Sequence, residues 1–159
     1  MLKAALGSTA FFFAAPCVVG GLVPWAVSGW AAPRFWPGFV VVAAGALVVL
    51  RAFARFVREG RGTPAPVAPP EELVVGGDYR FVRNPMYVGV VTAILGQALV
   101  FLDPWVLLYA VLAWAVMASF VRLYEEPVLR ERYGRQYEEY CRTVPAWMPR
   151  RFLSGEKGR

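Results

Sequence analysis

The stretch YRFVRNPMYVG (residues 79–89) places charged and polar side chains at the start of a long apolar run, residues 86–102. Three more apolar runs cover residues 6–27, 35–56 and 105–123. A helix rises about 1.5 Å per residue against a hydrocarbon core of roughly 30 Å, so each run is long enough to matter for crossing a bilayer. The sequence predicts about four transmembrane helices.

The composition supports this prediction. The chain has 159 residues, of which 58% are hydrophobic, and its mean hydropathy is positive. A soluble globule of this size is rarely so apolar. Residues 1–17 superficially resemble a secretion or lipoprotein signal, but Pro16 and the apolar residues that continue to residue 27 favour a membrane span. We expect an all-α integral membrane protein.

The basic residues predict the orientation of the chain. With four spans and the N-terminus inside, Lys3, the arginines of residues 51–83 and the basic residues from 122 onward lie on the cytoplasmic side. Only Arg34 remains outside. The net charge of +6 follows this topology rather than a nucleic-acid-binding stripe, so no nucleic acid partner is expected. We predict cytoplasmic termini in a bacterial or archaeal inner membrane.

The chain has no histidine, which removes Ser-His-Asp triads, His-based metal sites and the commonest general base near neutral pH. No metal is expected. Cys17 lies in the first predicted span and Cys141 in the polar tail, too far apart to pair.

Polar sequence gathers in two segments. Residues 61–79 are rich in Pro and then Gly, which predicts a loop. Residues 123–149 alternate charged and apolar side chains. There Pro127 is expected to open a short amphipathic helix, Gly134 to interrupt it, and a second short helix to end near Arg142, before an extended VPAWMP. These segments predict a cytoplasmic helical tail beside a loop.

A tight turn at Asp103-Pro104 makes the last two spans an antiparallel hairpin, so Glu125 should finish at the membrane depth of Asn84 and Tyr87. A carboxylate at a lipid boundary is costly unless it is paired. Taken singly, the arginines of residues 79–89 are compatible with headgroup anchors and Gly89 with close helix packing. Taken together, the groups predict a polar pocket for a small water-soluble ligand.

Residues 73–89, LVVGGDYRFVRNPMYVG, are followed by EEPVLRERYGRQYEEYCRTVPAWMP at residues 125–149. This ordered pattern resembles the C-terminal signature of the isoprenylcysteine carboxyl methyltransferase family and, more distantly, of the membrane phospholipid N-methyltransferases. The resemblance covers about residues 71–149. Together with the apolar runs, which predict two N-terminal transmembrane helices in residues 1–60, it indicates a methyltransferase core in residues 61–159, whose tail is expected to close a cofactor pocket.

The resemblance implies S-adenosylmethionine as cofactor, with S-adenosylhomocysteine as product, and a lipophilic small molecule or lipid as acceptor in the bilayer. Catalytic roles fall on Tyr87, Arg122 and Glu125. The implied cofactor-binding residues are Glu71, Glu72, Leu73, Val74, Tyr79, Asn84, Pro85, Tyr87 and Glu125. Methyl transfer from a sulfonium is an in-line displacement, in which positioning of donor and acceptor supplies much of the rate.

The sequence departs from the family pattern at two positions. Asn84 replaces the family's His, and the substrate-orienting Arg would fall at Val121 by strict spacing, with Arg122 one place along. Methylation of a lipophilic acceptor, by carboxyl O-methylation of a prenylcysteine-like substrate or of a related small lipophilic molecule, is the leading expectation. A lipid amine N-methyltransferase and a non-catalytic membrane protein that binds cofactor or lipid are the alternatives. A transporter or channel fits poorly, because no charge lies in the middle of a span.

Overall fold

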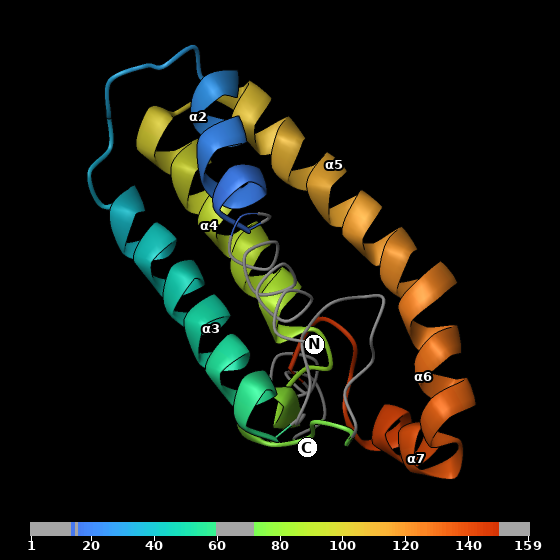
Figure 1. Ribbon diagram of the computed structural model, residues 1–159. Coiled ribbons are helices and arrows are strands. Elements are labelled where there is room, and N and C mark those ends of the chain that lie inside the picture. The colour runs from blue at the N-terminus through green and yellow to red at the C-terminus, as the bar shows by residue number, and fades with distance from the viewer. Residues whose placement is uncertain (1–13, 15, 60–71, 150–159) are drawn as a thin grey trace, which may run out of the picture.

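The structure is a computed structural model that describes residue 14, residues 16–59 and residues 72–149. All regular secondary structure in these residues is helical, which confirms the predicted all-α class for this part of the chain (Figure 1). Glu71 and the first part of the first predicted span lie outside the described residues.

The body of the fold is formed by three helices that run lengthwise: α3 (Gly38–Glu59), α4 (Pro85–Phe101) and α5 (Pro104–Phe120) (Figure 1). A π-helical segment (Val18–Leu22) continues into the short helix α2 (Val23–Val27), which packs against α4 and α5. Each of the four predicted spans therefore corresponds to a helix in the described residues, except that residues 35–37 and residue 102 lie just outside α3 and α4.

Two helices in the described residues are long and apolar enough to cross a bilayer, judged by length and composition: Gly38–Phe56 and Pro104–Tyr133. The helical stretches Val18–Val27 and Pro85–Phe101 are apolar but shorter. Large apolar side chains on α3 and α5, among them Val40 and Val116, are exposed, as expected for surfaces that face lipid.

Helices α3 and α4 pack backbone against backbone. A Cβ added at Gly45 would lie 2.5 Å from the amide nitrogen of Ala93, and one at Gly96 would lie 2.5 Å from the amide nitrogen of Val42. Only glycine permits this approach, which is how small residues bring membrane helices together. The contact fixes α4 against α3 along its length.

The turn between α4 and α5 is as tight as predicted. Leu102 adopts a left-handed conformation with φ of 51°, and the side chain of Asp103 accepts a hydrogen bond of 2.8 Å from the backbone nitrogen of Trp105. Pro104 is the first residue of α5, where its missing N–H costs nothing. This turn sets the register between α4 and α5.

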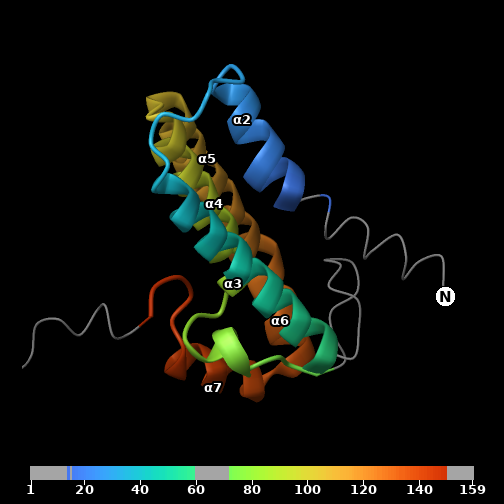
Figure 2. The same ribbon diagram turned by 90° about the vertical axis from the view of Figure 1, so that its left-hand side faces the viewer.

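Helix α5 does not stop at the predicted end of the fourth span. It passes through a second π-helical segment (Val121–Glu125) into α6 (Glu126–Tyr133), with Pro127 in the first turn of α6. Gly134, with φ of 50°, then ends the helix, and α7 (Arg135–Thr143) folds back at the end of the bundle where α4 begins (Figure 2). The predicted break at Gly134 is confirmed.

Candidate functional site

The hairpin joins a phenol of α4 to a carboxylate of the second π-helical segment. Tyr87 donates a hydrogen bond from its hydroxyl to Oε1 of Glu125, with an oxygen-to-oxygen distance of 2.5 Å. Both side chains are half-buried. A π-helical turn holds one more residue than an α-helical turn, and such segments are frequent at functional sites. The expected juxtaposition of Glu125 with the start of α4 is therefore present in the structure.

Tyr79 adds a second phenol beside this pair. Its side chain is buried against Ala52 and Val74, and its hydroxyl has no hydrogen-bond partner among the residues that the structure describes. Burial, followed by the electrostatic influence of Tyr140, Glu125 and Asp78, raises the pKa of Tyr79 far above its ordinary value. The phenol is therefore a neutral group with an unused hydrogen bond, and such groups are uncommon in protein interiors.

The loop before α4 positions Tyr79. Gly77–Arg80 form a 3₁₀ turn, and Arg51 of α3 makes an ion pair of 3.1 Å with Asp78 in that turn. The hydroxyl of Tyr140 donates a hydrogen bond of 2.7 Å to the backbone carbonyl of Tyr79. The turn is thus held from α3 on one side and from α7 on the other.

The extended tail is paired with the residues that precede α4. The backbone nitrogen of Arg83 donates to the carbonyl of Pro145 at 2.9 Å, and that of Asn84 donates to the carbonyl of Ala146 at 3.3 Å. The side-chain amide of Asn84 donates to the same carbonyl at 3.2 Å. Asn84 therefore anchors the tail, in addition to standing immediately before Pro85, the buried first residue of α4.

Arg83 holds the tail a second time. Its Nη1 lies 2.9 Å from Oε1 of Glu126, 3.2 Å from the hydroxyl of Tyr137 and 2.9 Å from Sγ of Cys141. The side chains of Arg83 and Glu126 are only 14% and 16% exposed. We call Arg83, Glu126, Tyr137 and Cys141 the tail clamp, because the group joins the start of α4 to α6 and α7.

Trp147 covers the Tyr87 side of the site. Its ring lies 6.4 Å from that of Tyr87 and 6.1 Å from that of Trp114 of α5, measured between centroids. These are distances at which aromatic rings attract one another. The tail therefore closes the space between α4 and α5 next to the Tyr87–Glu125 pair.

The remaining predicted residues fall in less central places. Val74 is buried and Leu73 half-buried in the loop, while Glu72 is exposed at the edge of the described residues. Arg122 is exposed, and its neighbour Val121 is buried with 3% exposure. The structure thus brings Tyr79, Tyr87 and Glu125 together, whereas Arg122 stays on the outer surface of its helix.

Sequence reasoning missed the tail clamp. It treated Arg83 as one of two guanidinium groups of the pocket, yet Arg83 is committed to the tail and Arg80 is exposed. The signal was present in the spacing of Tyr137 and Cys141, which lie four residues apart and so share one face of a helix. In the described residues no group of three or more His, Cys, Asp or Glu side chains could hold a metal ion.

Comparison with known proteins identifies the family. The phospholipid methyltransferase family profile matches residues 33–136, the greater part of the chain. The chain belongs to this family. The match spans α3, α4, α5, Tyr79 and the Tyr87–Glu125 pair, whereas α7 and the extended tail lie almost wholly beyond it.

Curated relatives agree with the resemblance read from the sequence. The protein-S-isoprenylcysteine O-methyltransferase B of Arabidopsis thaliana is 34% identical over 79 residues, 49% of this chain and 40% of the relative. A probable protein-S-isoprenylcysteine O-methyltransferase of Oryza sativa subsp. indica is 30% identical over 79 residues, 49% of this chain and 41% of the relative. The chain thus spans less than half the length of these relatives. No solved structure matches the chain significantly.

These findings confirm the resemblance to the isoprenylcysteine carboxyl methyltransferases. Together with the two long apolar helices, membership of this methyltransferase family supports a membrane location. The named relatives are plant proteins, so the expectation of a bacterial or archaeal membrane has no support from them.

Proposed function

We propose that this chain is an S-adenosylmethionine-dependent methyltransferase that acts on a lipophilic acceptor. The observation that carries the proposal is the pairing of Tyr87 with Glu125 beside the unpartnered hydroxyl of Tyr79, within a methyltransferase family. A carboxylate and a neutral phenol are suitable partners for the hydroxyl and amino groups of a nucleoside cofactor.

The described residues fit that cofactor. Glu125 uses one carboxylate oxygen for Tyr87 and has a second oxygen for a ligand hydroxyl or ammonium group. Tyr79 supplies the unused hydroxyl, and Leu73 and Val74 supply backbone groups in the adjacent loop. When bound, the cofactor supplies an activated methyl group on a sulfonium centre.

The chain's own contribution is positioning and exclusion of water. Tyr87 orients the carboxylate of Glu125, while the tail, held by the tail clamp and by Asn84, keeps Trp147 over the site. Fixing two reactants in a near-attack arrangement is worth up to roughly 7 to 11 kcal/mol in favourable cases, so a methyltransferase needs no covalent intermediate with the protein.

For the acceptor we propose a prenylcysteine-like carboxylate, because the curated relatives are named for that substrate. A lipid amine is the second candidate, and the family description favours it. A carboxylate is already a nucleophile at neutral pH, whereas an amine must first lose a proton. The carboxylate of Glu125, which is hydrogen-bonded to Tyr87, is the group that we propose accepts that proton.

Binding and turnover are tested separately. S-adenosylhomocysteine at 100 times its dissociation constant should stabilise the purified protein by about 2.7 kcal/mol, which a thermal unfolding assay in detergent detects. Incubation with labelled cofactor and a total lipid extract should then place label in a lipophilic product. Release of the label by mild base indicates a methyl ester, and retention indicates an N-methyl group. Absence of both stabilisation and transfer would refute the proposal.

We further propose that four helices cross the membrane with both termini and the polar site on the cytoplasmic side, as the basic residues predict. A single cysteine introduced at Glu131, exposed on α6, in a chain without Cys17 and Cys141 provides the test. A membrane-impermeant maleimide should label it in inverted vesicles but not in right-side-out vesicles. The reverse pattern would overturn the orientation.

A further inference from the structure

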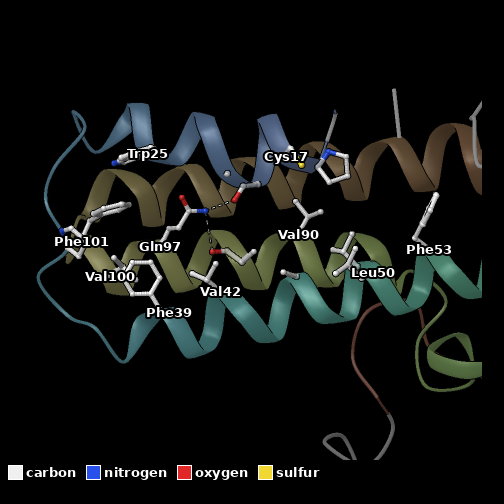
Figure 3. A pocket seen from close by; sticks show the side chains of 17 residues that line it. Cys17, Trp25, Phe39, Val42, Leu50, Phe53, Val90, Gln97, Val100 and Phe101 are labelled. Carbon is white, nitrogen blue, oxygen red and sulfur yellow. Dashed lines mark hydrogen bonds between the residues drawn. The ribbon is translucent and has the colours of Figure 1, made fainter. Parts of the chain in front are cut away.

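An apolar cavity of about 620 Å³ lies apart from the polar site, between the first π-helical segment with α2 on one side and α3 on the other (Figure 3). Helix α4 forms its floor through Val90, Ala93, Gln97, Val100 and Phe101. Its volume falls within the range of about 300 to 1,000 Å³ that is usual for small-molecule pockets. Figure 3 shows that the cavity extends along the helices, from Trp25 and Phe101 at one end to Leu50 and Phe53 at the other.

Missing side chains create the cavity. A Cβ added at Gly21 would meet no atom within 4 Å, and one at Gly20 would only touch Val90 at 3.3 Å. The π-helical wall is nevertheless fixed, because Gln97 donates to the carbonyl of Gly20 and Tyr109 donates to the carbonyl of Val19 at 2.9 Å. This wall of the cavity is therefore held in place, whereas the opposite side is open, because Trp25, Phe39 and Leu50 in the lining are 46%, 42% and 56% exposed.

The cavity and the polar site share one stripe of α4. Val90 and Phe101 are eleven positions apart, or about 17 Å at 1.5 Å per residue, roughly half of a hydrocarbon core of about 30 Å. Tyr87 lies three residues before Val90, less than one helical turn beyond the end of the cavity. On α3 the step is equally short, because Phe53, which lines the cavity, adjoins Ala52, which packs with Tyr79.

We propose that this cavity binds the single hydrocarbon chain of the lipophilic acceptor, with the reacting head group at Tyr87 and Glu125. This inference rests on the proposed function. The length and the almost wholly apolar lining suit a prenyl or acyl chain. Because the cavity ends at Val90, less than one helical turn from Tyr87 on α4, the acceptor's chain is favoured over that of a bilayer lipid.

The cavity should mainly determine where the head group lies relative to Tyr87 and which chain lengths are accepted. Lipid tails are as apolar as the side chains of the cavity, so we expect a chain to gain only about tenfold in affinity, about 1.4 kcal/mol, by leaving the bilayer. A slot that ends one turn from Tyr87 instead fixes how far the head group can reach. We therefore expect a preference among chain lengths, with losses of about tenfold when the slot is filled.

The test uses tritiated S-farnesylcysteine and the full chain in nanodiscs of dimyristoyl phosphatidylcholine. Gly21→Phe fills the slot from the π-helical wall, where a side chain meets no atom, and Ala46→Phe fills it from α3. The matched control is Val116→Phe on α5, whose side chain is 70% exposed. Both filling variants should weaken binding about tenfold, the control should not, and the shorter S-geranylcysteine should be affected less.

Stabilisation by S-adenosylhomocysteine is measured on the same samples and should be unchanged in all three variants. If the wild type does not respond to S-adenosylhomocysteine while the filling variants still lose S-farnesylcysteine, the proposed function fails and the chain site stands. Equal binding by wild type and both filling variants would overturn the chain site. So would native mass spectra in which a bound phospholipid is not displaced by S-farnesylcysteine.

Discussion

Glu125 and Glu126 are neighbours in sequence but belong to different parts of the molecule. Glu125 ends the second π-helical segment and accepts a hydrogen bond from Tyr87, beside a phenol that lacks a partner. Glu126 begins α6 and pairs with Arg83 in the tail clamp. Glu125 has one carboxylate oxygen that is not bonded to Tyr87, whereas both carboxylate oxygens of Glu126 are paired with arginines. A difference of one residue along a helix thus separates the carboxylate that we propose as a ligand-binding group from one that holds the tail in place.

The largest expected effect comes from breaking the tail clamp. Arg83→Met leaves Glu126 with only the exposed Arg130 as a cation, and removal of one partner from a buried ion pair costs about 3 kcal/mol. The free energy of unfolding in detergent should fall by that amount. The control is Arg130→Met, because Arg130 is 59% exposed and only 3.5 Å from the other oxygen of Glu126, and surface pairs contribute about 0 to 1 kcal/mol. Equal losses in the two variants would show that the clamp is not structural.

Glu125→Ala tests the proposed ligand-binding role of Glu125, in contrast to the structural role of Glu126. Hydrogen bonds to charged groups are worth about 1.5 to 3 kcal/mol, so affinity for S-adenosylhomocysteine should fall about 10- to 150-fold by calorimetric titration. Glu126→Ala should lower the free energy of unfolding but change the affinity of the folded protein less than about threefold. If both glutamates lowered the affinity equally, the separation drawn above would be wrong.

The sequence predicted the helices and the meeting of Glu125 with the start of α4, because both follow from run lengths and from one turn. Long apolar runs are typical of helices that face lipid. The Asp103-Pro104 turn sets the register between α4 and α5, so Tyr87 and Glu125 lie at the same level along the bundle. What the sequence could not provide is the rotation of each side chain about its helix axis. The continuation of α5 through a π-helical segment sets that rotation, and no local propensity marks such a segment.

The same limit explains Arg83 and the cavity. From the sequence, Arg83 and Arg80 were equivalent cations at a helix start, and only the path of the tail distinguishes them. The cavity beside Gly21 depends on how α2 packs against α4 and α5. This packing joins apolar surfaces, and no motif in the sequence predicts it. The exposed position of Arg122 likewise follows from helix rotation and not from its spacing to Glu125.

Tyr87→Phe is expected to have a smaller effect than Glu125→Ala. It removes the hydroxyl that orients the carboxylate but leaves the carboxylate in place, so the loss should be near 1 kcal/mol, or about fivefold in affinity for S-adenosylhomocysteine. Calorimetric titration measures it, and Tyr109→Phe, whose hydroxyl bonds to Val19 far along the bundle, is the control. In Glu125→Ala the same substitution should have almost no further effect, because contacting residues are not additive. Full additivity in this double-mutant cycle would argue against coupling.

Of these variants, Tyr79→Phe should change the free energy of unfolding of the ligand-free protein least. The sign of that change is informative. A buried hydroxyl without a partner carries a desolvation cost, so its removal should leave the free energy of unfolding unchanged or slightly higher. Tyr140→Phe, which loses a hydrogen bond of 2.7 Å to the carbonyl of Tyr79, should lower that free energy by about 1 kcal/mol.

The ligand should reverse this order. Affinity for S-adenosylhomocysteine should fall about fivefold in Tyr79→Phe, if its hydroxyl bonds the ligand, and stay near the wild-type value in Tyr140→Phe, whose hydroxyl is already used within the fold. Calorimetric titration and an unfolding curve for each variant give its affinity for S-adenosylhomocysteine and its free energy of unfolding. A Tyr79→Phe protein that is destabilised without ligand and unaltered in affinity would mean that the free phenol serves the fold, and the polar site would then rest on Glu125 and Tyr87 alone.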